Sequence, residues 1–237
     1  TTRGSEQEYI ELLKGEMPKN KTNIFEGINT TWSRIEGGAA VGKILIDIEN
    51  NFDFTDPSKH LPQLLEAYKV LMKLKDSHWK SIKLKELKDI IQSVCGLYLE
   101  ATASDSNMYP GGTVTINIEA LNRSSAAIEL KTIAIAKDIR ADKSIALEEN
   151  QKELINLKLP IPVNTDYTSP YWLNKKGSIG MYQVEDQQLI GKPETPHAFE
   201  VTFLMEFNGI PLKIRKPVVY RYSKPDKGER YQPFEIL

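Results

Sequence analysis

The chain has 237 residues, of which 40% are hydrophobic and 27% are charged. This composition can bury one substantial core or two modest ones, and it excludes an intrinsically disordered chain. The 31 basic and 32 acidic residues give a net charge of −1, so no overall positive field attracts a nucleic-acid backbone or an anionic membrane surface. We expect one or two globular domains and no nucleic-acid partner.

Cysteine usage and apolar runs set further limits. Cys95 is the single cysteine, which excludes a disulfide within the chain and a multi-cysteine metal site. Its position beside Ile91 and Val94 predicts a small buried hydrophobe. No apolar run approaches the roughly 18 residues that a membrane span needs. The sequence begins Thr-Thr-Arg-Gly, without a Met or a signal-peptide pattern, which indicates a processed product or an excised piece.

The first part of the chain is expected to begin with a helix. Residues 5–8, SEQE, match a capping box, in which a Ser hydroxyl and a Glu carboxylate satisfy free backbone amides. The apolar residues that follow, Tyr9, Leu12 and Leu13, share one helical face. Gly15 ends this predicted helix.

Three further helices are predicted from apolar residues that recur every three or four positions. The first covers residues 25–35, despite Gly27. The second covers residues 61–72 and the third covers residues 81–95. Because only residues 75–80 link these last two helices, we expect them to pack antiparallel.

Residues 37–43, GGAAVGK, match the spacing of a phosphate-binding P-loop, in which backbone amides cradle phosphate and a lysine neutralises it. Ile44, however, occupies the position where a Ser or Thr hydroxyl must hold magnesium. Residues 43–50, KILIDIEN, alternate like a strand and so do not supply the helix that the motif requires. We therefore interpret this stretch as a flexible glycine turn.

After Gly96 the apolar period changes from about 3.6 to 2, which indicates β structure with one buried face. Asn208-Gly209 is predicted to form a hairpin turn. The predicted strands are residues 97–103, 114–120, 127–136, 154–159, 179–184, 199–207, 210–214 and 218–222. The predicted fold class is α+β, with a helical domain over residues 1–95 followed by an antiparallel, immunoglobulin-like β-sandwich over residues 96–237.

The sequence offers no recognisable catalytic or metal-binding motif. The three histidines, His60, His78 and His197, are far apart and never stand in a zinc-binding spacing. A G-x-S-x-G nucleophile elbow is also absent. The carboxylate pairs at 148–149 and 185–186 lie in polar, turn-like stretches, where solvated charges are expected. A hydrolase site assembled from distant residues stays open as a third alternative.

One aromatic cluster has functional potential. Tyr167, Tyr171 and Trp172, with Asn174 nearby, could stack on a sugar ring and hydrogen-bond its hydroxyls. The competing interpretation is structural, with Trp172 anchoring the long loop over residues 160–178 onto the rest of the protein. These four residues form the candidate ligand-binding set.

Five segments carry a family resemblance. They are VNTDYTSPYWL at 163–173, PVVYRYSKPDKGE at 217–229, FEGINTTWSR at 25–34, ALNRSS at 120–125 and LIGKPETP at 189–196. Together they resemble the C-terminal, non-catalytic region of long PIG-L/LmbE-like deacetylases of Bacteroidota type. The resemblance implies an upstream deacetylase domain in the same polypeptide, which uses zinc to act on N-acetylated amino sugars, and export to the periplasm or the cell exterior.

The resemblance transfers no catalytic residue to this chain. The catalytic domain of that family is marked by a His-Pro-Asp-Asp type segment, and the nearest string here, PHAF at 196–199, lacks both aspartates. We therefore expect a non-catalytic accessory region that supports the deacetylase domain or presents glycan to it, without a metal or cofactor of its own. The alternative is an independent carbohydrate- or cell-surface-binding module centred on the aromatic cluster.

Overall fold

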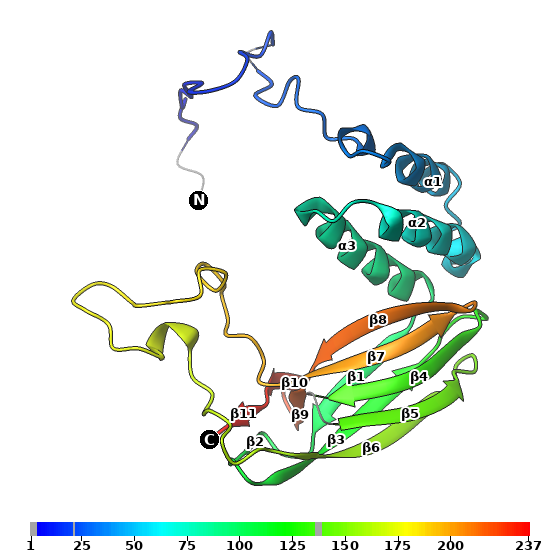
Figure 1. The fold of residues 1–237 in the computed structure, drawn as a ribbon, viewed down its shortest axis with the longest axis vertical. Helices are drawn as coiled ribbons and strands as arrows, with labels where there is room; N and C mark the ends of the chain where they lie inside the picture. Colours follow the sequence, from blue (N-terminus) through cyan, green and yellow to red (C-terminus); the bar gives the residue numbers. More distant parts are fainter. Residues whose placement is uncertain (1–3, 21, 136–138) are drawn as a thin grey trace.

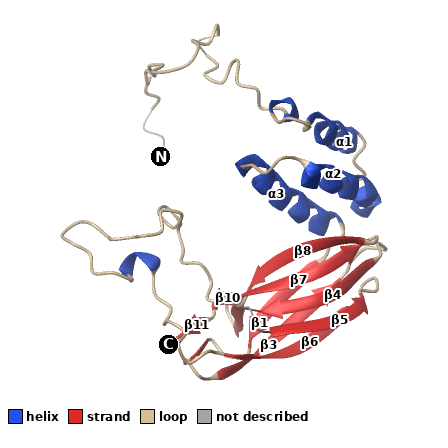
Figure 2. Cartoon of the chain, viewed as in Figure 1, coloured by secondary structure: helices blue, strands red, loops and turns tan. Residues whose placement is uncertain are grey.

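The computed structural model describes residues 4–20, 22–135 and 139–237. Its N-terminal helices lie above a body made of β-strands (Figure 1), and Figure 2 shows one further short helix in the long loop beside the strands. The helical elements are η1 (Trp32–Arg34), α1 (Ala39–Asn50), η2 (Pro57–His60), α2 (Leu61–Lys73), α3 (His78–Val94) and η3 (Tyr171–Leu173). The strands are β1 (Tyr98–Ala103), β2 (Asn107–Met108), β3 (Thr113–Leu121), β4 (Ile128–Ile135), β5 (Ile139–Ala146), β6 (Lys152–Pro160), β7 (Glu200–Phe207), β8 (Ile210–Pro217), β9 (Val219–Lys224), β10 (Gly228–Pro233) and β11 (Glu235–Ile236).

Helices α2 and α3 confirm the two predictions at residues 61–72 and 81–95. The apolar face of α2 buries Leu61, Leu64, Leu65 and Leu71. A side-chain cap fixes the start of α3, because the Ser77 hydroxyl accepts a hydrogen bond from the Lys80 amide at 3.1 Å. The helix boundaries therefore follow from apolar spacing and capping residues that the sequence displays.

The helix predicted to start at Ser5 is wrong, because residues 4–20 contain no helix. The apolar side chains of Tyr9 and Leu13 are almost fully exposed. A capping box satisfies backbone amides but buries nothing, and a short helix without tertiary packing is marginal in water. The prediction at residues 25–35 is also wrong in extent, since only the short η1 forms there.

Residues 39–50 form helix α1, so the strand-like interpretation of KILIDIEN is wrong, and the interpretation of residues 37–43 as a flexible glycine turn is wrong from Ala39 onward. Val41, Ile44, Leu45 and Ile48 recur at helical spacing and pack into the core, which is the signal that the alternation obscured. Gly42 lies inside this helix and faces Trp32, where an added Cβ would be 2.9 Å from the Trp32 Cβ. This glycine therefore allows close packing of α1 on η1.

The strands form two larger antiparallel sheets arranged like a sandwich. One sheet has the order β10-β9-β1-β3-β6 and the other has the order β5-β4-β7-β8, while β11 and β2 make a small parallel pair. Among the described residues, the exception to antiparallel pairing within the larger sheets is the contact of β9 with β1, which is parallel. Asn208 and Gly209 both have positive φ values, 46° and 80°, as expected for the predicted hairpin turn between β7 and β8.

One strand prediction is wrong, and four of the described strands were not predicted. Residues 179–184 form no strand and contribute one isolated bridge between Ser178 and Met181. Strand β5 was missed, because its sequence IRADKSIA belongs to a mostly exposed sheet edge and lacks an alternating apolar pattern. The short strands β2, β10 and β11 were also missed for lack of apolar alternation.

The connection between α3 and β1 is short and well packed. Gly96 adopts a positive φ of 55°, and the amide of Leu97 donates to the Gln92 carbonyl at 2.9 Å. Buried side chains from the helices and both larger sheets form one apolar cluster. The domain boundary between residues 95 and 96 stays a prediction.

Two buried polar groups hold the sandwich at specific points. Asn122, 1% exposed, donates to the carbonyls of Ala126 and Leu147 at 3.0 and 3.1 Å, and its Oδ1 accepts from the Ser124 amide and hydroxyl. Glu100, 9% exposed, pairs with Arg221 at 2.9 Å and so ties β9 to β1. Both side chains are paired, which removes the cost of burying them.

Candidate functional site

The candidate site lies in the long connection between β6 and β7, residues 161–199, which projects from one end of the sandwich (Figure 1). The start of this connection is fastened to strand β11. The Thr168 amide donates to the Ile236 carbonyl at 2.9 Å, and the Ile236 amide donates to the Thr168 hydroxyl at 3.2 Å. The connection thus has a defined base from which side chains can be presented.

Tyr171 and Trp172 form the centre of the site. Their rings meet edge to face, with centroids 4.9 Å apart and an interplanar angle of 88°. Tyr171 is 9% exposed, its hydroxyl donates to the Lys192 carbonyl at 3.0 Å, and its amide donates to the Thr195 hydroxyl at 3.1 Å. Tyr171 therefore ties the outgoing and returning halves of the connection together, while the half-buried Trp172 keeps part of its ring accessible.

A concave pocket of about 490 Å³ opens beside these two rings. Aromatic and apolar side chains dominate its walls, and Lys192 is the one charged residue among them. The residues that line it are Tyr171, Trp172, Tyr182, Val184, Ile190, Gly191, Lys192 and Pro193. A pocket of this size and character suits a small organic ring with apolar faces and a polar rim.

The structure divides the predicted ligand-binding set. Tyr171 and Trp172 line the pocket, whereas Tyr167 and Asn174 do not. Tyr167 is 70% exposed, and the Asn174 Oδ1 accepts a hydrogen bond from the Ser169 hydroxyl. The structural interpretation named Trp172 as the anchor and stays a prediction; the hydrogen bonds described above belong to Tyr171, and they join it to the returning half of the same connection.

Three residues that line the pocket were not predicted from the sequence. Tyr182, Val184 and Ile190 come from the returning half of the connection, part of which was interpreted as a strand. The sequence feature that could have indicated them is a group of apolar residues without a period of 2 or 3.6, followed by a Gly-Lys-Pro turn, which is typical of a folded loop.

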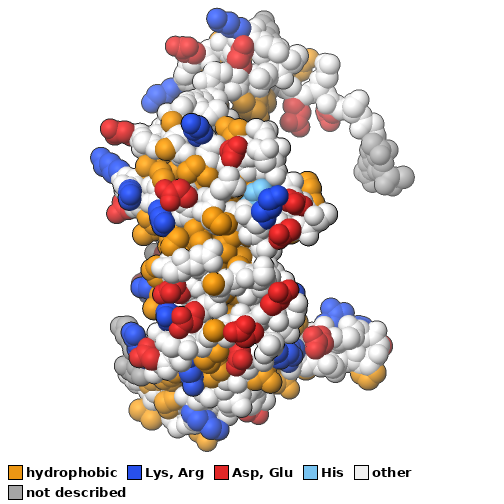
Figure 3. All heavy atoms as spheres, turned by 90° about the vertical axis from the view of Figure 1, so that its right-hand side faces the viewer, with side chains coloured by type: hydrophobic (Ala, Val, Ile, Leu, Met, Phe, Trp, Pro, Cys, Tyr) orange, Lys and Arg blue, Asp and Glu red, His pale blue; other side chains and the backbone are white. Residues whose placement is uncertain are grey.

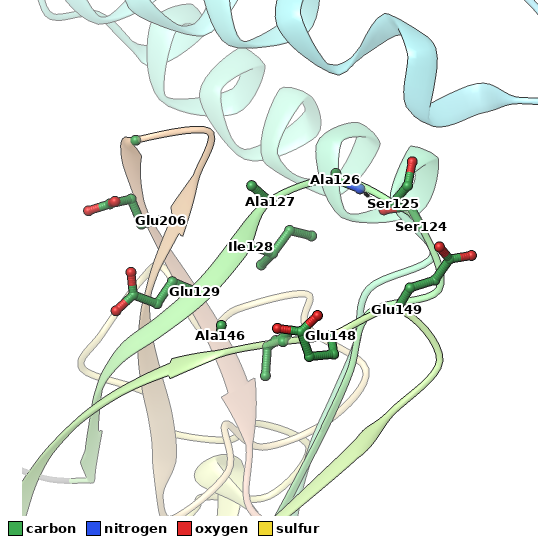
Figure 4. A pocket seen from close by; sticks show the side chains of 12 residues that line it. Ser124, Ser125, Ala126, Ala127, Ile128, Glu129, Ala146, Glu148, Glu149 and Glu206 are labelled. Atoms are coloured by element: carbon green, nitrogen blue, oxygen red, sulfur yellow. Dashed lines mark hydrogen bonds between the residues drawn. The ribbon is translucent and has the colours of Figure 1, made fainter.

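A second pocket, of about 480 Å³, contains four glutamates (Figure 4). Glu129 and Glu206 lie on the neighbouring strands β4 and β7, and both approach Lys131, at 2.6 and 3.8 Å. Glu148 and Glu149 follow β5 and are exposed, and Figure 4 shows them apart from the other two. These carboxylates do not converge on one point, and this arrangement gives no support to paired acid-base chemistry.

The histidines also remain separate. His60 is buried, its Nε2 accepts from the Asp53 amide at 2.9 Å, and its ring stacks on Phe52. His78 begins α3, and His197 lies in the connection just before β7. Within the described ranges, no group of three or more His, Cys, Asp or Glu side chains is placed to hold a metal ion. None of the helices in that part of the chain has the length and apolarity to cross a bilayer.

Comparisons with known proteins give no family. No protein-family model matches the sequence, and no curated protein is similar enough to count as a match. Among solved structures, the sporulation control protein Spo0M of Bacillus subtilis aligns at a TM-score of 0.28 and 10% identity, over 52% of this chain and 48% of Spo0M. The chain thus spans about half of that protein.

Two other solved structures align equally distantly. The alkylpurine DNA glycosylase AlkC of Pseudomonas fluorescens has a TM-score of 0.24 and 8% identity, over 72% of this chain and 49% of that one. The β-glucosidase EmGH1 of Erythrobacter marinus has a TM-score of 0.22 and 12% identity, over 52% and 16% of the two chains. At these TM-scores none of the three supports a functional argument.

Proposed function

We propose that this chain is a non-catalytic accessory region whose binding element is the pocket beside Trp172, and that the pocket holds one sugar ring of a glycan. The observation that carries the proposal is the edge-to-face packing of Trp172 on an anchored Tyr171, in a pocket that Tyr182 also lines. Sugar rings present apolar C–H faces that stack on aromatic side chains, and their hydroxyls hydrogen-bond at the rim.

The hydrogen bonds that anchor Tyr171 favour a ligand-binding role for the aromatic cluster over a purely structural one. Tyr171 uses both its hydroxyl and its amide to hold the returning segment, so the pocket wall is formed before a ligand arrives. Preorganisation lowers the entropy cost of binding, which matters most for a site with few charged groups. Lys192 supplies a cation at the rim for a ligand hydroxyl or carboxylate.

We further propose that the sandwich is of immunoglobulin-like type. The orders β1-β3-β6 and β5-β4-β7-β8 correspond to strands A-B-E and C′-C-F-G of such a sandwich. Loops cluster at the two ends of immunoglobulin-like sandwiches and often carry their binding sites. The long connection between β6 and β7 would then be an enlarged end loop.

Calorimetric titration with N-acetylglucosamine oligosaccharides tests the proposed binding. We expect the wild-type chain to bind and Trp172→Ala to weaken binding by about tenfold or more, since aromatic anchors carry much of the energy of such contacts. Tyr167→Ala is the matched control, because Tyr167 is an aromatic residue of the same loop outside the pocket lining. Equal binding by the wild type and Trp172→Ala, or no binding at all, would refute the proposal.

A second candidate function is scaffolding of a zinc-dependent PIG-L-like deacetylase domain in the same polypeptide. The observation that favours it is unpaired apolar surface near the N-terminus, where Tyr9, Leu13 and Phe25 are exposed. Ile46 of α1 and Met72 of α2 are exposed as well, and Figure 3 shows apolar side chains at the surface of the helical layer. Such surface often marks a contact with another domain.

Activity measurements separate an accessory region from a hydrolase. Zinc content and deacetylation of N-acetylglucosamine substrates would be compared for this chain alone and for a polypeptide extended upstream. Activity and zinc in the extended protein alone support the accessory assignment. The periplasmic or extracellular location that the family resemblance implies is a separate proposal. Activity with stoichiometric zinc in this chain would instead revive the hydrolase alternative and overturn the accessory assignment.

A further inference from the structure

A different concave site lies where the long connection runs into strand β7. The segment 196–199 borders a pocket of about 610 Å³ on the outer face of the four-stranded sheet. Its walls come from β4, β7, β8 and the end of the connection, and they share no residue with the aromatic pocket. The lining residues are Ala134, Pro196, His197, Ala198, Phe199, Glu200, Thr202 and Arg215.

The first indication of a ligand is an unsatisfied nitrogen. His197 Nδ1 is buried and has no hydrogen-bond partner in the described part of the protein, a condition shared there only with Gln92 Oε1. Buried polar atoms are nearly always paired in folded proteins, because burial removes their water without replacement. Because this nitrogen has almost no accessible surface, a ligand in the pocket pairs with it only when the half-buried His197 ring turns toward the pocket.

The second indication is a row of three residues across neighbouring strands. Ala134 of β4 is paired in register with Thr202 of β7, and Thr202 with Arg215 of β8. The small side chain of Ala134 leaves room above the sheet, while Thr202 brings a hydroxyl and Arg215 a guanidinium. Together with His197, they can offer three kinds of hydrogen-bond donor to one pocket.

Positive charge is concentrated around Arg215. Lys213 lies two residues earlier in β8 and therefore on the same face of the sheet. Lys88 of α3 lies close enough for both charges to affect its pKa. Burial is the largest cause that lowers this pKa, and the charges of Arg215 and Lys213 lower it further. Over the described ranges, none of these three cations has a carboxylate within 4 Å.

Two carboxylates partly offset the positive charge around Arg215. Asp89 follows Lys88 and partly offsets the effect of the two other cations on its pKa. Glu200 lines the pocket itself. The lining itself carries one cation, Arg215, and one carboxylate, Glu200. The excess positive charge comes from Lys213 and Lys88 beside it. Like charges held near one another are stabilised when an anion binds between them.

We propose that this pocket binds a tetrahedral oxyanion of the phosphate or sulfate class. Arg215 supplies the fork of guanidinium N–H donors that suits such an anion, Thr202 donates from the neighbouring strand, and His197 donates from the end of the connection. Three donor groups, two on the sheet and one on the connection, fit an anion with at least three acceptor oxygens better than a two-oxygen carboxylate. Lys213 and Lys88 contribute longer-range attraction. The site is independent of glycan binding in the aromatic pocket.

The test is an NMR titration of the whole chain with inorganic phosphate, inorganic sulfate and, in a third arm, acetate. Saturable shifts of the Phe199, Thr202 and Arg215 amides with phosphate or sulfate, and weaker ones with acetate, are expected. The two inorganic arms show which tetrahedral anion is preferred. Non-saturating shifts in all arms would overturn the proposal.

Variants assign the effect to this pocket. Arg215→Gln should weaken anion binding at least tenfold, and Glu200→Gln should strengthen it severalfold by removing the one lining carboxylate. Arg140→Gln is the matched control. Arg140 of β5 is paired in register with Ala134, but its guanidinium already forms an ion pair with Asp142 at 3.0 Å. Unchanged binding by a folded Arg215→Gln protein, verified by its melting curve, would refute the assignment, as would an equal loss in Arg140→Gln.

Discussion

Asn122 offers the sharpest test of how the sandwich is held together. It follows β3 and is almost completely buried, yet every polar atom of its side chain is used. The amide group donates to two carbonyls on separate segments, those of Ala126 and Leu147, while Oδ1 accepts two hydrogen bonds from Ser124. Replacement by alanine removes all four hydrogen bonds and leaves buried partners unpaired.

The expected cost follows from those four bonds. Each intramolecular hydrogen bond contributes about 0.5–1.5 kcal/mol net, and unpaired buried groups cost more. Some partners of Asn122→Ala will recover through water or rotation of the Ser124 hydroxyl, so we expect a loss of about 2–4 kcal/mol in the free energy of unfolding. For a protein of this size that corresponds to a fall of roughly 5–15 °C in Tm.

Urea unfolding followed by circular dichroism measures this loss. Asn156→Ala is the control, because Asn156 is an exposed asparagine in strand β6, and its replacement should change the free energy of unfolding by less than about 0.5 kcal/mol. If Asn122→Ala and Asn156→Ala unfold at the same urea concentration, the buried network does not stabilise the sandwich and the reasoning fails.

Three further predictions concern other parts of the fold. Gly42→Ala places a Cβ 2.9 Å from the Trp32 Cβ and should cost about 1–3 kcal/mol through displacement of η1, with a shift in tryptophan fluorescence; an unchanged melting curve would contradict the packing. Burial raises the pKa of the Cys95 thiol to about 11, so alkylation at pH 8 should be far slower in the folded than in the unfolded chain. Because this raised pKa favours the protonated thiol in the folded state, its contribution to stability should be present below about pH 8.5 and be lost as the pH rises to about 11; a Cys95→Ala protein with the same alkaline profile would rule this out. Arg221→Ala leaves Glu100 buried without its partner and should lower the free energy of unfolding by about 1–3 kcal/mol. The double variant Glu100→Gln/Arg221→Ala should lose less, which chemical denaturation of both proteins measures.

Periodicity predicted the elements that bury one regular face. Helices α2 and α3 and the alternating strand β3 follow directly from the spacing of their apolar residues. The predictions were wrong where an apolar face has no partner to pack against, and where a strand-like and a helical period overlap in one segment. Residues 5–13 have a helical pattern but no surface to pack against, and residues 43–50 alternate over a few positions inside a longer helical stripe.

The candidate site was predicted in part for a similar reason. Tyr171 and Trp172 stood out because adjacent aromatic residues are visible in any sequence. Tyr182 and Ile190 reach the same pocket by the return of an irregular loop, whose path depends on contacts such as that of the Tyr171 hydroxyl with the Lys192 carbonyl. No local period encodes such a path, so residues that meet through it are invisible to pattern analysis.

The most direct test of the proposed function is to map where an N-acetylglucosamine oligosaccharide contacts the protein, by NMR of the isotope-labelled chain. The account predicts saturable shifts of the Trp172 indole N–H and of amides over residues 182–193, with no change at the helices. Shifts confined to another surface, or an indole signal that does not respond at saturating oligosaccharide, would contradict it.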